Sequence, residues 1–325
     1  MTYDEFKLEN SRIFITGGAG FIGSTLIGRL LEGNKVMAYD NMARDSLSGK
    51  DFANHPNLTL VKGDVLDIDL LKRSMGDFRP SHVVHCAAIA GINTVILKPV
   101  TTMKVNMIGS ANVLEAASLI EGVKRVVCFS TSEVFGQQAF CSTEKDPGIT
   151  GEVGEARWTY AVSKLAEEHL AYAYFHERKL PIVVVRPFNI YGPGQVGEGA
   201  LRTFITRALE DKTIEIHGDG TQIRAWCYVD DMIDGVELCM SHPKALGESF
   251  NIGNQKAVLT IYGLANTVVR TLNSKSKLVF VNKDYVDVEL RVPAVKKARD
   301  YIGFEAKVSL EEGIQRTAEY LRTIK

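Results

Sequence analysis

Short apolar runs alternate with longer amphipathic stretches along the first part of the chain. The runs are rich in Ile and Val and predict strands at residues 12–16, 35–39, 58–61, 82–86, 125–130 and 181–186. Apolar side chains recur every three or four residues at 21–31, 66–75, 100–120 and 159–177, which predicts helices. Strands that alternate with helices favour an α/β fold of the Rossmann type, built on a doubly wound parallel sheet.

The pattern changes after residue 187. Glycines become frequent at 192–199 and 218–220, the predicted elements become shorter, and a last helix is predicted at residues 310–321. We therefore predict a first domain at residues 1–187, with a segment near residues 226–254 returning to it. Residues 188–325 are expected to form mainly a smaller C-terminal lobe that binds the substrate.

Composition narrows the class of protein. The 325 residues are 45% hydrophobic and 24% charged, with a formal net charge of −1, so no overall field draws the chain to nucleic acid or a membrane. The longest aliphatic run, residues 182–185, is far too short to span a bilayer. The five cysteines are scattered without CxxC spacing, which favours reduced thiols and a cytoplasmic location.

Two histidines have a spacing that is found in some metal sites. Residues three apart on a strand point to opposite faces of the sheet, so His82 and His85 are expected to pack rather than to share a metal. No other group of histidines and cysteines has ligand spacing, and no metal site is predicted.

A glycine-rich loop joins the first predicted strand to the first predicted helix. Gly17, Gly20 and Gly23 allow a tight turn and a close approach of a pyrophosphate to the N-terminus of the helix. Asp40 ends the next strand, where its carboxylate can accept hydrogen bonds from the ribose hydroxyls of NAD and would repel the extra phosphate of NADP. The alternatives are a plain glycine turn and an ordinary aspartate at a strand end.

Tyr160 and Lys164 are four residues apart, so they share one face of a predicted helix. A free phenol has a pKa of about 10, and a nearby ammonium would favour its ionised form. Tyr160 could then take a proton from a sugar hydroxyl while hydride leaves for NAD. The spacing alone is weak, because Tyr and Lys are common on helix surfaces.

Taken together, these motifs resemble the extended short-chain dehydrogenase/reductase family, in particular its nucleotide-sugar epimerase, dehydratase and decarboxylase branch. The resemblance runs through nearly the whole chain. It rests on residues 16–23 (Thr-Gly-Gly-Ala-Gly-Phe-Ile-Gly), 40–41, 63–65, 85–88, 106, 130–136 (Ser-Thr-Ser-Glu-Val-Phe-Gly), 160–164, 186–193, 218–224 and 291–293.

The resemblance implies a role for each matching residue. The residues implied to line the NAD site are Gly17, Gly20, Phe21, Ile22, Gly23, Asp40, Asn41, Asp64, Val65, Cys86, Ala87, Ala88, Asn106, Ser130, Tyr160, Lys164 and Pro187. The residues implied to be catalytic are Tyr160, Lys164, Thr131, Ser132 and Glu133, with Tyr160 as the base at the sugar C4 hydroxyl. The residues implied to bind the substrate are Thr131, Asn189, Arg202, Arg224 and Arg291.

Glu133 bears on the reaction that follows oxidation at C4. The triplet at residues 131–133 (Thr-Ser-Glu), Arg157-Trp158 and residues 291–293 resemble decarboxylases and some dehydratases, whereas simple epimerases have no acid at the Glu133 position. Phe135, Gln137 and the sequence at residues 199–202 depart from the decarboxylase pattern. We expect Glu133-assisted decarboxylation of a UDP-hexuronate or dehydration of a nucleotide hexose. Sugar-nucleotide 4-epimerisation is the alternative, and an NAD-binding scaffold without catalysis is a remote one.

The family resemblance also implies a partner. Related enzymes often dimerise through the two long helices, predicted here at residues 100–120 and 159–177, so a homodimer is expected. The same helices would cover the sheet in any case.

Overall fold

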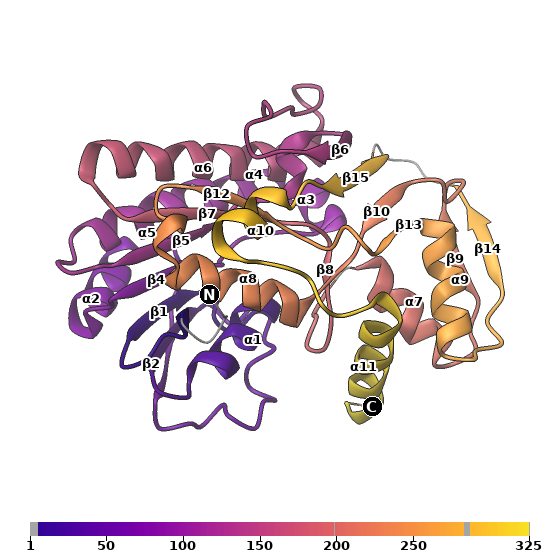
Figure 1. Ribbon diagram of the computed structural model, residues 1–325, viewed down its shortest axis with the longest axis horizontal. Coiled ribbons are helices and arrows are strands. Elements are labelled where there is room, and N and C mark those ends of the chain that lie inside the picture. The colour runs from indigo at the N-terminus through magenta and orange to yellow at the C-terminus, as the bar shows by residue number, and fades with distance from the viewer. Residues whose placement is uncertain (1–5, 198, 283–286, 325) are drawn as a thin grey trace.

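The computed structural model describes residues 6–197, 199–282 and 287–324. A seven-stranded parallel sheet lies at its centre, in the strand order β12-β7-β5-β4-β1-β2-β3 (Figure 1). These strands are β1 (Arg12–Thr16), β2 (Lys35–Asp40), β3 (Leu58–Lys62), β4 (His82–His85), β5 (Arg125–Phe129), β7 (Ile182–Pro187) and β12 (Ser249–Ile252). The prediction of a Rossmann-type parallel sheet is confirmed.

Helices cover both faces of this sheet, as its continuous apolar strands require. One face packs against α1 (Phe21–Leu30) and α8 (Val229–Ser241), and the other face packs against α2 (Ile68–Phe78), α5 (Gly109–Ser118) and α6 (Thr159–Arg178). Every residue of β4 and of β5 is buried, because these strands lie in the middle of the sheet.

The helix predicted at residues 100–120 is not regular. It is divided into α4 (Pro99–Met103), a π-helical turn η2 (Lys104–Ile108) and α5. Asn106 lies in the π turn, where its side chain bonds both Ile89 N at 2.8 Å and Ile89 O at 3.1 Å. Such turns recur at functional sites, and periodicity in the sequence does not reveal them.

The chain crosses between the two halves of the molecule in both directions. β12 lies within the segment 226–254 and returns to the central sheet, where it pairs with β7. In the opposite direction, β6 (Gln138–Ser142) belongs in sequence to the first 187 residues but lies in the smaller lobe, where it pairs with β15 (Leu290–Pro293). The pattern of apolar residues did not predict this second crossing.

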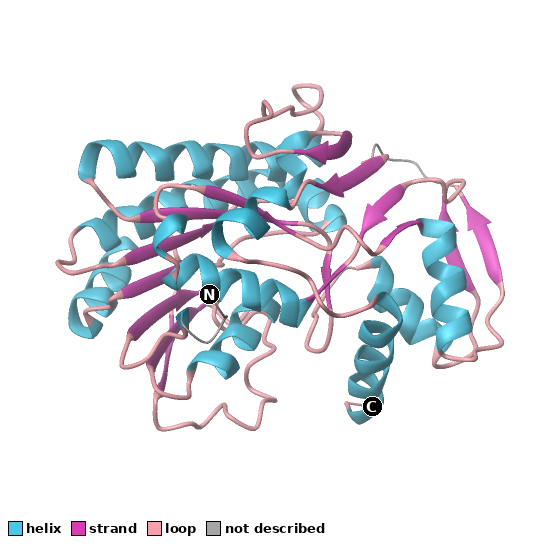
Figure 2. Ribbon diagram, viewed as in Figure 1, coloured by secondary structure: helices cyan, strands magenta, loops and turns pink. Residues whose placement is uncertain are grey.

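The smaller lobe contains the remaining sheets and three helices packed together (Figure 2). Its strands are β8 (Ile190–Tyr191), β9 (Ile214–His217), β10 (Ile223–Ala225), β11 (Cys227–Tyr228), β13 (Val258–Thr260) and β14 (Leu278–Val281), together with β6 and β15. Its helices are α7 (Ala200–Ala208), α9 (Ile261–Thr271) and α11 (Leu310–Thr323). Two short helices, α3 (Ile92–Leu97) and α10 (Lys296–Ile302), complete the described fold.

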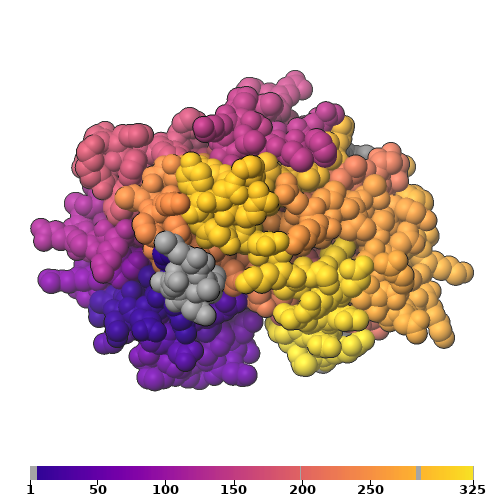
Figure 3. Space-filling view, viewed as in Figure 1, coloured from indigo at the N-terminus to yellow at the C-terminus, as the bar shows by residue number. Residues whose placement is uncertain are grey.

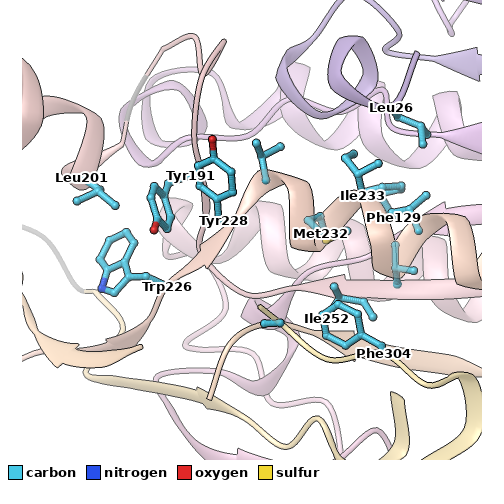
Figure 4. Packing of buried hydrophobic residues seen from close by; sticks show 14 of the residues in the cluster. Leu26, Phe129, Tyr191, Leu201, Trp226, Tyr228, Met232, Ile233, Ile252 and Phe304 are labelled. Atoms are coloured by element: carbon cyan, nitrogen blue, oxygen red, sulfur yellow. The ribbon is translucent and has the colours of Figure 1, made fainter. Parts of the chain in front are cut away.

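One buried apolar cluster connects the lobes. It runs from Leu26 and Phe129 beside the central sheet through Met232 on α8 to Trp226 and Leu201 in the smaller lobe (Figure 4). In the space-filling view, the late orange and yellow segments pack directly against the indigo and magenta first half (Figure 3). Burial of this shared apolar core holds the two lobes together.

Three features of the described residues bear on the class of protein. No described helix is both long enough and apolar enough to cross a membrane. The five cysteines are unpaired, and no group of three potential metal ligands occurs in the part of the chain that the structure describes. His82 and His85 are both buried, and His85 bonds Thr16 at 2.7 Å and Ser110 at 2.9 Å.

Candidate active site

Two glycines of the loop have no room for a side chain. A Cβ atom on Gly17 would lie 2.6 Å from Ala87 N, and one on Gly23 would lie 2.3 Å from Gly17 O. A Cβ on Gly20 would approach only Gly17 O, at 3.2 Å, so this glycine faces a more open side. Gly20 is the N-cap of α1 and makes no side-chain cap bond, so N–H groups at this helix terminus stay available to an anion.

Asp40 ties this loop to the end of β2. Its Oδ2 accepts the Ala19 N–H at 3.0 Å, and its Oδ1 accepts the Met42 N–H at 2.7 Å. Burial raises the pKa of Asp40, and these backbone hydrogen bonds oppose the shift. The Gly20 N–H also bonds this carboxylate. A carboxylate has about four lone-pair sites, so Asp40 keeps a site that can accept from a hydroxyl, as a ribose would require.

The other predicted cofactor residues gather at the carboxyl ends of neighbouring strands. Cys86 follows β4 and donates its N–H to Thr16 O at 3.0 Å, while Pro187 ends β7. Ser130 follows β5, and its buried Oγ has no hydrogen-bond partner among the described residues. The orphaned hydroxyl and the open side of Gly20 fit a dinucleotide at this edge of the sheet, which is where doubly wound folds bind ligands.

Four further predicted cofactor residues have structural partners in this region. Asn41 donates to Asp64 Oδ2 at 3.3 Å, and Val65 is buried with its methyl group against Gly109. Asn106 holds the chain after β4 through Ile89. The residues implied to line the cofactor site are therefore brought together, but their contacts with NAD stay a prediction.

Tyr160 and Lys164 lie on one face of α6. Thr131 Oγ1 accepts the Glu133 N–H at 3.2 Å, which leaves the hydroxyl proton of Thr131 for its hydrogen bond to the Tyr160 phenol. Burial raises the pKa of Tyr160, and Lys164 together with this bond opposes the shift. The phenol therefore sits where an ammonium and a hydroxyl can both stabilise its anion.

An ionic cluster lies beside this pair. Arg157 binds Glu133 through two bonds, Nη1–Oε2 at 2.6 Å and Nη2–Oε1 at 3.2 Å. Arg291 approaches Glu133 Oε1 at 3.5 Å, and Arg224 approaches Asp287 at 3.5 Å. We name Glu133, Arg157, Arg224, Asp287 and Arg291 the arginine cluster. It brings together residues from η3 (Ser132–Phe135), η4 (Ala156–Trp158), β10 and β15.

The electrostatics of the arginine cluster favour an additional anion. Burial alone would raise the pKa of Glu133, but Arg291 and Arg157 hold it below its usual range. Burial and the neighbouring Arg291 lower the pKa of Arg224 to about 10. Three arginines face two carboxylates, and the buried Nε and Nη2 of Arg291 have no hydrogen-bond partner among the described residues. A carboxylate from a bound molecule would satisfy these donors.

Not every predicted substrate residue joins this cluster. Arg202 lies on α7, with its Nη1 3.5 Å from Gly197 O. Asn189 has a left-handed backbone with φ of 44° and donates to Ala225 O at 2.8 Å, next to Arg224. Ser132 is buried behind Glu133. The structure places Asn189 next to Arg224 of the cluster. The buried Nε of Arg202 has no hydrogen-bond partner among the described residues, and a role of Arg202 in substrate binding stays a prediction.

Sequence analysis missed two charged residues of this site. Asp287 lies four residues before Arg291, but no motif marks it. Glu167 is buried and contacts Lys164 Nζ at 2.5 Å. Its position three residues after Lys164 on a helix was the available signal, because such residues are neighbours on one face.

A glycine loop at a helix N-terminus, a strand-end aspartate and a Tyr–Lys pair define a dinucleotide-dependent α/β enzyme. Residues 13–253 match the NAD-dependent epimerase/dehydratase family, so the chain belongs to that family. The predictions of an enzyme and of NAD as its cofactor are confirmed by this membership.

Individual relatives are similar over almost their entire length. A UDP-N-acetyl-alpha-D-glucosaminuronate decarboxylase of Bacillus cytotoxicus is 34% identical, over 96% of this chain and 98% of its own. A UDP-glucuronate 4-epimerase of Thermodesulfobacterium geofontis is 32% identical, over 94% of each chain. The solved structure of a Bacillus cereus UDP-glucuronic acid 4-epimerase with UDP-glucuronic acid and NAD has a TM-score of 0.87 at 28% identity, covering 96% of this chain and 99% of that one.

Proposed function

We propose that this enzyme binds a UDP-hexuronate and releases its carboxyl group as CO2 after transient oxidation at C4. The observation that carries the proposal is the arginine cluster, in which Arg291 has buried donors without partners. A hexuronate carries a carboxylate that a neutral hexose lacks, and paired guanidinium groups suit it. The relatives named for UDP-hexuronates support the choice of nucleotide and sugar.

The first step of the proposed reaction belongs to α6. Tyr160 takes the proton of the sugar C4 hydroxyl, and Lys164 stabilises the phenolate before that transfer. Thr131, which donates a hydrogen bond to the Tyr160 phenol, orients the C4 hydroxyl beside it. NAD, when bound, supplies the hydride acceptor for C4. Gly17, Gly20, Gly23 and Asp40 would hold it, by the cradle that their backbone forms.

The second step belongs to the arginine cluster. A ketone at C4 allows the bond between C5 and the carboxyl carbon to break, because the electron pair moves toward the carbonyl oxygen. CO2 leaves and C5 takes up one proton. Tyr160 then returns its proton to the C4 oxygen as the ketone becomes a hydroxyl again, and the reduced cofactor, when bound, would supply the hydride. A substrate carboxylate bound to Arg157 and Arg291 would draw them from Glu133. The pKa of Glu133 would then rise, since these arginines hold it down, so that it could pass a proton toward C5.

The second candidate is 4-epimerisation of the same UDP-hexuronate. The two-bonded grip of Arg157 on Glu133 favours it, because a carboxylate held ionised by arginines could serve only to position them. The substrate class is shared between the two candidates, and only the fate of the carboxyl group differs.

Mass spectrometry of products from UDP-glucuronate, UDP-N-acetylglucosaminuronate and UDP-glucose tests the proposal. Loss of CO2 from either uronate supports decarboxylation, and unchanged mass with a new C4 stereoisomer supports epimerisation. Turnover of UDP-glucose alone, by isomerisation or by loss of water, would overturn the assignment of the arginine cluster to a carboxylate.

We infer that two copies of the chain pair through the helices that cover one face of the sheet. Large apolar side chains are exposed along α3, η2, α4 and α6, which are Leu97, Val100, Met107, Ile108 and Val162. Contiguous exposed apolar groups mark an interface in a water-soluble chain. Light scattering should give twice the mass of the chain, and Ile108→Glu should shift it toward the monomer.

We also infer which part of the chain binds the cofactor and which the substrate, and in which cellular compartment the protein works. Residues 1–187 with the returning segment 226–254 would hold the cofactor, and the rest of the chain would hold mainly the substrate. Unpaired cysteines throughout the fold favour a reducing compartment such as the cytoplasm. Thiol counting on protein isolated without reductant checks the second inference.

A further inference from the structure

Lys164 forms a buried ion pair that none of the steps above uses. Its Nζ lies 2.5 Å from Glu167 Oε2, and both side chains are only 1% exposed. Tyr160, Lys164 and Glu167 are spaced four and three residues apart, so α6 presents all three on one face. Along α6, Tyr160 therefore belongs to the turn before Lys164, and Glu167 to the turn that follows it.

Among the residues that the structure describes, the groups around this pair offer no second carboxylate for Lys164. The titratable groups that face Lys164 or Glu167 are Tyr160 and Glu168 on α6, His85 and Cys86 at the end of β4, and Cys128 on β5. Burial lowers the pKa of His85 to about 3 and raises the pKa of both thiols, so these groups are neutral near pH 7. Glu168 binds Arg186 through two bonds, at 3.1 Å and 2.5 Å.

We infer that Glu167 is the counter-ion of Lys164, a positioning residue that keeps the ammonium charged and fixed beneath Tyr160. An isolated buried ammonium is strongly disfavoured and tends to lose its proton. Burial lowers the pKa of Lys164, whereas Glu167, the largest opposing contribution, and Tyr160 leave it raised. The inference rests on the proposed role of Lys164, because a neutral lysine would no longer favour the phenolate of Tyr160.

The pair therefore sets the pH range over which the site stays active. Without the Glu167 carboxylate, Lys164 should titrate at lower pH, and activity should be lost on the alkaline side at correspondingly lower pH. A purely structural carboxylate would change stability without moving either titration.

NMR of enzyme labelled with ¹³C at the lysine Cε, purified with its NAD, tests this inference. Lys164→Met identifies the Lys164 signal by its loss. We expect that signal to stay in the ammonium form to at least pH 9 in the wild type, and to titrate at least about one unit lower in Glu167→Gln. The alkaline limb of kcat/KM should move in the same direction. An unmoved Lys164 titration in folded Glu167→Gln overturns the inference.

Two further variants serve as controls. Glu167→Asp keeps the charge and should restore most of the wild-type titration, which a loss of packing alone would not do. Glu168→Gln removes a buried carboxylate one residue away, but one that binds Arg186, so it should leave the Lys164 signal in place. A shift in Glu168→Gln equal to that in Glu167→Gln would contradict a specific role.

Failure of Glu167→Gln to fold would move the test to stability. Lys164→Met/Glu167→Gln removes both charges, so it should recover a cooperative thermal unfolding transition that Glu167→Gln alone lacks. A double variant that also fails to fold would overturn the inference. The NMR titration and the thermal unfolding need no sugar turnover, so they fail or succeed independently of the proposed decarboxylation.

Discussion

Glu133 and Arg157 are 24 residues apart in sequence and form a two-bonded ion pair at 2.6 Å and 3.2 Å. Arg291, from the opposite end of the chain, approaches the same carboxylate at 3.5 Å. This arrangement places an acidic side chain that acts on Tyr160 under the control of two guanidinium groups. Whether Glu133 can donate a proton after C4 oxidation depends on how strongly these two arginines hold it ionised.

Glu133→Gln should slow protonation at C5, and with it steady-state CO2 release after the first turnover, by roughly 10²- to 10⁴-fold, the usual contribution of a positioned acid or base. Oxidation at C4 uses Tyr160 rather than Glu133, so reduced cofactor should accumulate on the enzyme. Absorbance at 340 nm after mixing with a UDP-hexuronate measures this. Unchanged CO2 release would show that Glu133 only positions the arginines.

Arg291→Gln should reduce the preference for a UDP-hexuronate over the matching UDP-hexose. A buried charge left without its partner costs about 2–5 kcal/mol, so kcat/KM for the uronate should fall about 30-fold or more, while weak use of the hexose stays unchanged. Arg316→Gln is the control, because Arg316 lies at the surface with Glu312. Equal losses for both sugars would place Arg291 elsewhere, for example at the diphosphate.

Tyr160→Phe should lower kcat by at least about 10²-fold, because it removes the proton acceptor. Most of the NAD should stay bound, because the glycine loop and Asp40 are unchanged. The NAD content of the denatured protein and the product yield are the two measurements. Tyr301→Phe is the matched control, since Tyr301 is exposed on α10. Full activity of Tyr160→Phe would favour the scaffold interpretation.

Two glycine variants separate folding of the loop from cofactor binding. Gly23→Ala puts a Cβ 2.3 Å from Gly17 O, so the protein should lose both thermal stability and NAD. Gly20→Ala meets protein atoms only at 3.2 Å, so it should fold nearly as the wild type but retain less NAD. Calorimetry and NAD content measure the two effects. Equal NAD retention in Gly20→Ala and wild type would move the pyrophosphate away from this glycine.

His85 should make the fold sensitive to acid. Burial lowers its pKa from 6.5 to about 3 in the folded chain. Between these values the unfolded chain binds a proton that the folded chain does not, so stability falls as the pH drops through this window, by at most about 1.4 kcal/mol per unit. Urea unfolding from pH 7 to pH 4 should show a shallower slope in His85→Gln.

His217→Gln is the control for that slope, because the His217 ring is exposed in the folded chain as in the unfolded one. If His85→Gln keeps the wild-type slope, then the acid sensitivity comes from other groups.

Much of the fold and half of the site follow from local patterns. The alternation of strands and helices, the glycine spacing and the four-residue interval between Tyr160 and Lys164 each depend on a few neighbouring residues. Backbone periodicity converts such intervals directly into positions on one face or at one turn. For this reason the parallel sheet and the gathering of Gly17, Asp40 and Ser130 at one edge could be predicted.

Only the tertiary structure decided which charges meet. Arg157 and Arg291 converge on Glu133 because β15 pairs with β6, a crossing between lobes that no periodicity encodes. Glu167 was within reach of a helical argument, but its burial against Lys164 depends on how α6 packs on the sheet. Periodicity acts over a few residues, whereas the pairing of distant side chains depends on how whole elements pack. The sequence by itself therefore determined that the predicted cofactor residues meet at one edge of the sheet. Tertiary packing decided which charged side chains surround Tyr160 and Glu133.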